Sequence, residues 1–463
     1  MPGLDRRSGS LRRHLQSSGP GAHDSRRRPM MRRKGFTERF RSHHDAKREL
    51  RKLVGADRYA SRAEPADLEL TLDRVPRTEQ RAVYLHVPYC DKLCSFCTMN
   101  RCRVDESLRS YAEELDETIA ARSSRAYINA TPFRAVYMGG GTPTVFAPAE
   151  LEVVLSSVRS HLPLADDVEW TIETTLHNLT DEKLAFLVEY GVNRISIGVQ
   201  TFSDRGRRLL GRSGSGEWAA TRIGELREAF PGSLCIDLIY SYPDQSEDEV
   251  AADATAAIAC GVDSVSLYSL MVHDGSALAA RIGDGELRFE RTTEWDRVRH
   301  NLLVTALRDG GFDLLELTKM ARPGRDEYRY IRVRYLNGDV LPIGQGAGGR
   351  LGDLELHYSR AGLMIGRADS RHDRYHLFLG DLQFGRYDAG VARARLGDEA
   401  ALRVEHALPE YEAAGYLRRG ASGALELTPD GVFWGNTLAV DLLGRIIEGN
   451  GAARPAPSEE RTV

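Results

Sequence analysis

The sequence predicts an α/β fold, a partial (β/α)6 barrel with a C-terminal helical, winged-helix-like accessory domain. Short β-rich runs alternate with amphipathic helical stretches, which predicts parallel strands joined by right-handed crossovers. Six units are too few for the usual eight-unit barrel, so we expect an open one. The expected strands are 83–87, 135–138, 168–174, 194–201, 235–240 and 264–271, and helices are expected at 108–122, 149–161, 181–190 and 247–260.

The length and composition are those of a soluble enzyme of more than one domain. The chain has 463 residues, 41% of them hydrophobic, and a formal net charge of −4, which identifies no class of partner. No apolar run approaches the ~18 residues that span a membrane. We expect four segments: a disordered basic extension (1–60), the barrel (78–290), the accessory domain (291–450) and a flexible tail (451–463).

The first 50 residues are rich in Arg and Ser and have no sustained apolar periodicity. Such a segment cannot bury enough surface to fold alone, so we expect a disordered tail. Nucleic-acid binding and organelle targeting are the alternative interpretations, as is translation that begins at Met30 or Met31. No apolar stretch of a secretory signal is present. We favour the disordered tail and expect no nucleic-acid partner.

The pattern changes after residue 290. A helix is expected at 295–309 and a strand at 313–317, followed by a Gly-rich turn at 341–349. The last hundred residues look helical with a β-ribbon, and 417 with 425–431 are similar to the wing and closing helix of a winged-helix module. These elements define the expected accessory domain.

Six cysteines occur, and four of them lie between residues 90 and 102. That clustering argues against a disulfide framework and favours a reducing, cytoplasmic location. Cys235 and Cys260 lie in apolar surroundings and are expected to be core residues.

Cys90, Cys94 and Cys97 form the most informative motif of the chain. Three thiolates on one short loop can hold three irons of a four-iron cluster and leave the fourth iron open to a small molecule. Phe96 precedes the last cysteine. The alternatives are buried thiols or a structural zinc loop, but zinc needs a fourth ligand at matching spacing, and Cys102 and His86 give no such pair.

A second motif, Gly139, Gly140, Gly141 and Thr142, directly follows an expected strand. Glycines let the backbone approach a ligand closely and present its polar groups. The alternative is a plain strand-to-helix turn. Alone, the glycine motif is weak evidence for a ligand site. Because it follows the cysteine loop by one strand–helix unit, the two motifs together are strong evidence.

Polar residues also occur at or within the later strands, namely Glu173, Gln200 and Asp237. A carboxylate inside an apolar strand is costly unless it is hydrogen-bonded or paired. Asp237 therefore needs a partner, and a ligand hydroxyl or Arg212 would serve. A buried structural salt bridge is the alternative. Tyr84 precedes the cysteines on the first strand, where its hydroxyl would face the same site.

Residues 83–320 resemble the coproporphyrinogen-oxidase-like branch of the radical S-adenosylmethionine (SAM) enzymes. The cysteine and glycine motifs carry the resemblance, with residues 193–202, 210–212 and 236–240 in the expected order. The resemblance implies a [4Fe-4S] cluster on the three cysteines and SAM on its open iron. It also implies a small-molecule substrate, a tetrapyrrole, and an electron donor such as a flavodoxin or ferredoxin.

The same resemblance suggests roles for the other residues. The SAM amino group would lie at the glycine motif, and Tyr84 and Phe96 would stand beside the reacting centre as catalytic candidates. The residues expected to meet the ribose and carboxylate of SAM are Glu173, Gln200, Arg212 and Asp237. Cleavage of SAM would give a 5′-deoxyadenosyl radical that abstracts a hydrogen from the substrate, while the barrel excludes water.

Departures from the pattern separate the members of this branch. The branch includes the oxygen-independent coproporphyrinogen dehydrogenase, the radical SAM heme chaperone and radical methyltransferases. The dehydrogenase carries a further cysteine where this chain has Met99, and Cys102 is displaced. The heme motif of the chaperone is replaced by Tyr330, Ile331, Arg334 and Tyr335. Segments 340–349 and 427–439 look like the anaerobic heme-degrading methyltransferases.

We therefore expect radical methyl transfer to a porphyrin with heme ring opening, using one or two SAM molecules. Three alternatives stay open: a radical methyltransferase or cyclopropanase of natural-product biosynthesis, a coproporphyrinogen dehydrogenase, and a non-catalytic heme carrier. The residues that select the substrate are expected near 330–349.

Overall fold

The computed structural model describes residues 31–32, 35–36, 39–57, 60–98, 100–421 and 423–449. Among these residues a 13-stranded sheet dominates, in the order β12-β13-β11-β10-β9-β8-β7-β4-β14-β15-β16-β17-β3. Its six central neighbours are all parallel. They are β4 (Arg81–Val87), β7 (Phe133–Gly140), β8 (Leu164–Thr174), β9 (Arg194–Gln200), β10 (Ser233–Tyr240) and β11 (Ser264–Ser269), which confirms the six expected strands.

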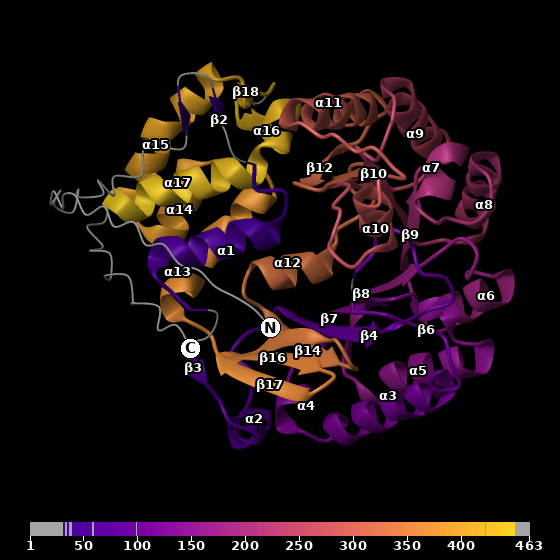
Figure 1. Cartoon of the computed structure of the whole chain (residues 1–463). Helices are drawn as coiled ribbons and strands as arrows, with labels where there is room; N and C mark the ends of the chain where they lie inside the picture. The colour runs from indigo at the N-terminus through magenta and orange to yellow at the C-terminus, as the bar shows by residue number, and fades with distance from the viewer. Residues whose placement is uncertain are drawn as a thin grey trace, which may run out of the picture.

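Helices follow the strands and surround the sheet (Figure 1). Several begin at a side chain that caps the first free backbone N–H groups, such as Thr180, Ser215 and Ser246. The barrel helices are α3 (Ser107–Ser123), α4 (Ala126–Asn129), α5 (Pro148–His161), α6 (Asp181–Glu189), α7 (Asp204–Leu209), α8 (Gly216–Ala229), α9 (Glu247–Ala259), α10 (Ala277–Gly283) and α11 (Thr293–Asp309).

The two faces of the central strands differ in chemistry. Side chains alternate between faces along a strand, and the parallel register carries each set across the sheet. The outer face is apolar and packs under the helices: Val83, Leu85, Val136, Met138, Trp170, Ile172, Ile195, Ile197, Ile236, Leu238, Val265 and Leu267. The inner face carries Tyr84, Tyr137, Glu173, Ser196, Asp237, Ser266 and Tyr268.

The sheet extends beyond the barrel at both edges. β14 (Asp339–Ile343) pairs parallel with β4 and continues into an antiparallel ribbon of β15 (Gly348–Leu351), β16 (Leu354–Ser359) and β17 (Gly362–Arg367), which ends on β3 (Ser61–Arg62). At the other edge β13 (Lys319–Ala321) pairs antiparallel with β11 and with β12 (Asp313–Glu316). The expected boundary at 290/291 is therefore wrong, because residues 313–367 hydrogen-bond into the barrel sheet.

The accessory domain has its own apolar core. Figure 1 shows α1 alongside α13 and α17, and α12 (Arg329–Tyr335) between this domain and the barrel. The domain consists of α1 (His43–Val54), α13 (Ser370–Gln383), α14 (Ala389–Leu396), α15 (Asp398–Ala413), the ribbon β18 (Leu417–Arg419) with β19 (Leu425–Leu427), α16 (Pro429–Phe433) and α17 (Gly435–Gly449). The expected ribbon and closing helix are present. No described helix has the length and apolarity to cross a membrane.

The expectation of disorder throughout residues 1–60 is wrong for the part that the structure describes. α1 starts with a capping box in which Ser42 and Asp45 bond each other's backbone N–H groups, and it buries Ala46 and Leu50 in the accessory core. Charged residues occupy the other faces of α1. The apolar face that it buries is therefore narrow and is hard to recognise in the sequence. α2 (Pro65–Leu72) follows. The tails at 1–30 and 451–463 lie outside the described residues.

The amino ends of the strands are closed by a buried ion pair. Arg194, the first residue of β9, donates from Nε and Nη2 to the two oxygens of Asp326, each at 2.9 Å. Burial alone would raise the pKa of Asp326, but the charge of Arg194 outweighs it and holds the pKa well below its usual range. This pair fastens the segment before α12 beneath the barrel, at the end opposite the strand ends where ligands bind in such folds.

Leu50→Ala tests whether α1 is part of the folded domain. Leu50 is fully buried, so we expect a loss of about 2–5 kcal/mol in the free energy of unfolding, measured by urea denaturation. Leu402→Ala on α15, where the side chain is 53% exposed, is the control and should change stability by less than about 0.5 kcal/mol. Equal stability of the two variants would contradict the placement of α1.

Candidate active site

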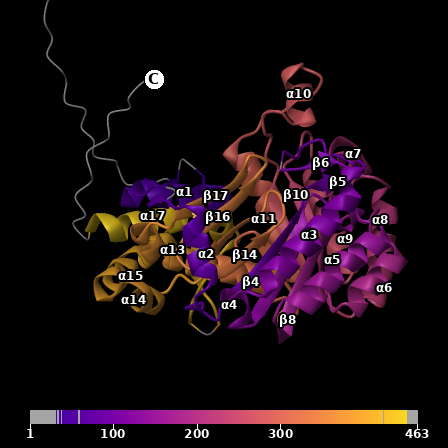
Figure 2. The same ribbon diagram turned by 90° about the horizontal axis from the view of Figure 1, so that it is seen from below.

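The cysteine loop leaves the carboxyl end of β4 and forms β5 (Tyr89–Cys90), which pairs parallel with β6 (Cys102–Arg103). Figure 2 shows β5, β6 and α10 gathered at one end of the barrel. Cys90 is buried, and Cys94 and Cys97 are half-buried. The three sequence-predicted ligands thus lie on one loop at the end of the strands.

Hydrogen-bond donors reach two of the three sulfur atoms and the backbone of the third cysteine. Arg212 Nη1 donates to Cys94 Sγ at 3.1 Å, and the Thr142 hydroxyl donates to Cys90 Sγ at 3.6 Å. Arg101 donates to the carbonyl of Cys97. Such donors stabilise negative charge on a sulfur ligand. Burial raises the pKa of the Cys90 thiol to about 11, so a metal is needed to hold that sulfur as a thiolate at neutral pH.

The arrangement differs from the site of a single ion. Among the described residues, no three His, Cys, Asp or Glu side chains converge tightly enough to hold one metal ion. In a four-iron cluster each thiolate binds a different iron, so its cysteines need not converge on one point. The donor set therefore fits a cluster.

The loop is fastened to segments that follow two other strands. Ser95 N–H donates to Leu210 O at 3.3 Å, and the Ser95 hydroxyl donates to Leu209 O at 2.7 Å. Ser95 O accepts from Leu278 N–H at 2.8 Å. Phe96 packs against an apolar group that includes Leu210 and Leu278. Phe96, expected to be catalytic, anchors the loop in this structure.

The glycine motif packs tightly against the cysteine loop. Gly141 N–H donates to Val87 O at 2.7 Å, and Thr142 N–H donates to Tyr89 O at 2.8 Å. A Cβ on Gly141 would lie 2.4 Å from Tyr89 O. Gly140 has a φ of +111°, and a Cβ there would lie 2.6 Å from the ring of His86. These positions require glycine because no side chain fits between the two loops.

Glu173 ties the motif to the inner face. Its carboxylate accepts from the Tyr137 hydroxyl at 2.6 Å and from Gly140 N–H at 3.1 Å. A Cβ on Gly139 would lie 2.7 Å from the same carboxylate. Burial raises the pKa of Glu173, and the bond from Tyr137 opposes that rise. Sequence reasoning missed Tyr137, although it lies two residues before Gly139 and so shares its face.

Gln200, Arg212 and Asp237 lie on neighbouring segments at the same end. Gln200 ends β9 with a φ of +73°, a strained conformation of the kind found at functional sites. Arg212 donates to Cys94 and to Gly198 O, so the suggested pairing with Asp237 is wrong. Within the described residues the half-buried Asp237 carboxylate has no hydrogen bond or ion pair, which leaves it available to a ligand.

Tyr84 and His86 are linked on the inner face of β4. The Tyr84 hydroxyl lies 2.9 Å from His86 Nδ1, and His86 Nε2 lies 3.1 Å from Asn100 O. Both ring nitrogens of His86 are therefore satisfied. Tyr330 of α12 stacks on Tyr84 and on Tyr137, with ring centroids 5.7 and 4.5 Å apart. Helix α12, which holds the residues aligned with the heme motif of the heme chaperone, thus lies against the inner face.

The inner face carries side chains that are partly accessible. Tyr268 exposes 41% of its surface, yet burial raises its pKa well above the usual value. Half-buried Tyr84 and Tyr328 and exposed Arg334 also have pKa values shifted by burial and by one another. We call the surface formed by Tyr84, Tyr268, Tyr328 and Arg334 the inner hollow.

A buried lysine also contacts the inner face, and no motif in the sequence predicted it. Lys319 of β13 donates to Cys235 Sγ at 2.9 Å and to the Ser266 hydroxyl. Its ammonium lies 4.8 Å from the centre of the Tyr328 ring. Cys235 is a core residue, as expected, but one with a charged partner. Met99, used above to separate two members of the branch, lies outside the described residues.

Gly141→Ala tests the packing of the two loops. Because the added Cβ would meet a backbone oxygen that cannot move aside, we expect the loops to shift and the affinity for SAM to fall at least about tenfold, or ~1.4 kcal/mol. Isothermal titration of the reconstituted protein measures it. Gly224→Ala, on α8 with open space around it, is the control. Unchanged SAM affinity in Gly141→Ala would contradict the packing argument.

Comparisons with known proteins agree with this geometry. A profile of the radical SAM superfamily matches residues 84–257. The chain is 27% identical over 393 residues to anaerobilin synthase of Escherichia coli O157:H7, covering 80% of this chain and 85% of that protein. It is 33% identical over 279 residues to the heme chaperone HemW of Mycobacterium tuberculosis, covering 58% and 69%.

The fold also matches a solved structure. Coproporphyrinogen III oxidase of Escherichia coli, described as a radical SAM enzyme, superposes with a TM-score of 0.68 at 20% identity, covering 84% of this chain and 97% of that one. With the matching profile and the relatives above, the chain belongs to the radical SAM superfamily, in its coproporphyrinogen-oxidase-like branch.

Proposed function

We propose that this protein uses SAM radical chemistry to transfer a methyl group to a porphyrin and open the ring of heme under anaerobic conditions. The observation that carries the proposal is the inner hollow, in which tyrosines of the inner face and the accessible guanidinium of Arg334 lie together. The similarity of this chain to anaerobilin synthase, which covers 80% of the chain, supports the same proposed function.

Cys90, Cys94 and Cys97 would hold a [4Fe-4S] cluster. When bound and reduced, this cluster supplies the electron that cleaves SAM to methionine and a 5′-deoxyadenosyl radical. The Arg212 guanidinium and the Thr142 hydroxyl, which already reach Cys94 and Cys90, would offset the negative charge of the thiolates. The electron donor would be a protein such as a flavodoxin or ferredoxin.

The residues around the glycine motif would orient SAM. Gly139 to Thr142 would meet its methionine end, and the free carboxylate of Asp237 is suited to accept from ribose hydroxyls. Gln200 would add an amide at the end of β9. Glu173 would act mainly by holding Gly140 in place. A second SAM would serve as the methyl donor if transfer follows the proposed route.

Tyrosines in the inner hollow would bind the substrate. Tyr84, Tyr137 and Tyr330 already stack on one another, and Tyr268 presents an open surface. Aromatic rings of this kind favour a flat, conjugated molecule. These contacts fit a tetrapyrrole better than a small polar substrate.

Cys94→Ala tests the cluster ligands. We expect the reconstituted variant to lose the sulfur-to-iron charge-transfer absorption of the cluster in the visible region. It should also lose most of its bound iron and sulfide, because one thiolate ligand is removed. Cys260→Ala, a half-buried cysteine on the outer side of the barrel, is the matched control and should keep both. Full iron and sulfide content in Cys94→Ala would overturn the ligand assignment.

Heme opening is tested by turnover. The anaerobically reconstituted protein is reduced and mixed with SAM and hemin. We expect the Soret band to fade while S-adenosylhomocysteine and 5′-deoxyadenosine form together. SAM cleavage that leaves heme intact would overturn the proposed reaction. Hemin binding without SAM cleavage would instead indicate a heme carrier, the function named for the chaperone relatives.

A further inference from the structure

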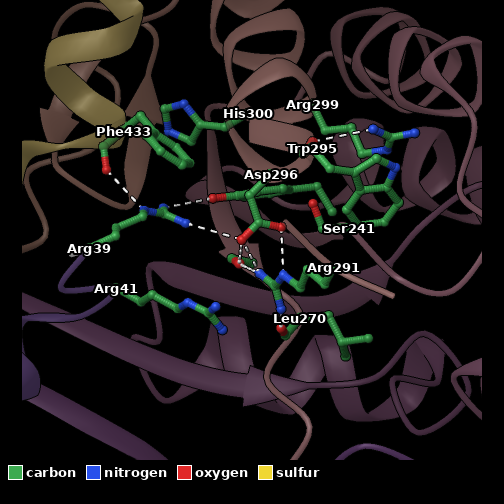
Figure 3. Close-up of polar contacts among 12 residues, drawn as sticks. Arg39, Arg41, Ser241, Leu270, Arg291, Trp295, Asp296, Arg299, His300 and Phe433 are labelled. Atoms are coloured by element: carbon green, nitrogen blue, oxygen red, sulfur yellow. Dashed lines mark hydrogen bonds and ion pairs between the residues drawn. The ribbon is translucent and has the colours of Figure 1, made fainter. Parts of the chain in front are cut away.

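Three arginines meet around one carboxylate at the rim of the barrel (Figure 3). Arg39 and Arg41 precede α1, and Arg291 precedes α11, which carries Asp296. Asp296 is 1% exposed. Arg291 donates from Nε to Asp296 Oδ1 at 2.6 Å, and Arg39 Nη1 lies 3.6 Å from Asp296 Oδ2. One carboxylate therefore serves two guanidiniums.

Arg39 and Arg291 are each held by further contacts. Arg39 also donates to Phe433 O and to the Tyr240 hydroxyl, each at 3.1 Å. Arg291 also donates to Leu270 O and to the Ser269 hydroxyl. These contacts fix Arg39 between the barrel and the accessory domain and Arg291 against the ends of the barrel strands. Within the described residues, Arg39 Nη1 is buried without a hydrogen-bond partner.

Arg41 differs from its two neighbours. Its side chain is exposed, and within the described residues its guanidinium has no hydrogen bond or ion pair (Figure 3). Burial lowers its pKa, and the charge of Arg291 lowers it further. Arg41 therefore combines accessibility with close surroundings, as Tyr268 does in the inner hollow.

The cluster has an excess of positive charge. Three guanidiniums face one carboxylate, which leaves two charges without a counterpart. His300 adds none, because burial lowers its pKa to about 3 and keeps the ring neutral. Guanidiniums that share a partner repel one another, so the cluster is suited to an incoming anion.

The cluster lies at the same end of the barrel as the cysteine loop. Tyr240 ends β10, and Ser269 ends β11, one residue after Tyr268. Ser241 follows with a φ of +63°, and its buried hydroxyl has no hydrogen-bond partner in the described part of the chain. Strained and unsatisfied groups of this kind gather at ligand sites.

We propose that Arg41, with Arg39 and Arg291 behind it, binds a carboxylate of the substrate at the rim of the inner hollow. The inference rests on the proposed function, in which the substrate is a tetrapyrrole with carboxylate side chains. The methionine end of SAM also has a carboxylate, so the test must separate these two sources. Arg and carboxylate form paired, charge-assisted hydrogen bonds that a neutral ester cannot make in the same way.

The test measures binding without turnover. The reconstituted, oxidised protein is titrated with hemin and with hemin dimethyl ester, followed by absorbance. The wild type should bind hemin more tightly than the ester. Arg41→Gln should lose about 10- to 100-fold in hemin affinity, as expected for a charge-assisted hydrogen bond, while its ester affinity stays unchanged. Arg41→Lys should retain part of the preference for hemin.

The matched control is Arg48→Gln, because Arg48 lies on α1 with 66% of its side chain exposed and pairs with Asp45. It should leave both affinities unchanged. Equal preference for hemin in Arg41→Gln and the wild type would overturn the inference. Loss of SAM affinity with unchanged hemin affinity would also overturn it and assign Arg41 to the cofactor.

Failure of the proposed function gives a different result. Suppose that the wild type prefers hemin to the ester through Arg41, but that reduction with SAM leaves heme intact. The proposed binding of a carboxylate by Arg41 is then supported, and the proposed ring opening is overturned. If the wild type opens heme and Arg41→Gln binds it equally well, only the role of Arg41 falls. If the wild type binds neither hemin nor its ester, both are overturned.

Discussion

The register of the parallel strands is the constraint on which the rest of the structure depends. Because side chains alternate along each strand, the same register that buries Trp170 and Ile197 beneath helices points Glu173 and Asp237 inward. A shift of one residue in any strand would exchange the two sets. Apolar packing outside the barrel therefore fixes the polar site inside it.

Contacts between loops then set the geometry of the sulfur atoms. The cysteine loop has little regular structure, and its position comes from hydrogen bonds to segments after other strands. Gly141 and Thr142 bond the backbone on either side of Pro88, and Arg212 reaches Cys94 from the segment after α7. Three units of the barrel thus hold one loop, and the close packing against it explains why Gly140 and Gly141 of the neighbouring glycine motif tolerate no side chain.

Much of this arrangement could be predicted from the sequence. Strand alternation gave the barrel, and the spacing of Cys90, Cys94 and Cys97 identified the loop. The sequence did not reveal contacts between distant segments: Tyr137 with Glu173, or Lys319 with Cys235. It also failed for α1, because a charge-rich segment shows its apolar stripe only when a partner surface is known. Strand β14 was missed since its pairing partner β4 precedes it by more than 200 residues.

The segment before α1 is fixed by contacts on both sides of Arg41. Arg39 is held by Phe433, Tyr240 and Asp296, and Ser42 caps α1 three residues later. Arg41 lies between these two anchors, so its backbone is ordered before any ligand arrives. A guanidinium on a disordered tail would have to lose that freedom on binding, whereas a preorganised one does not. The barrel carries the cysteine loop, and the segment before α1 brings the Arg41 guanidinium to it on a backbone that is already fixed, which is the charge that the proposed acidic substrate would require.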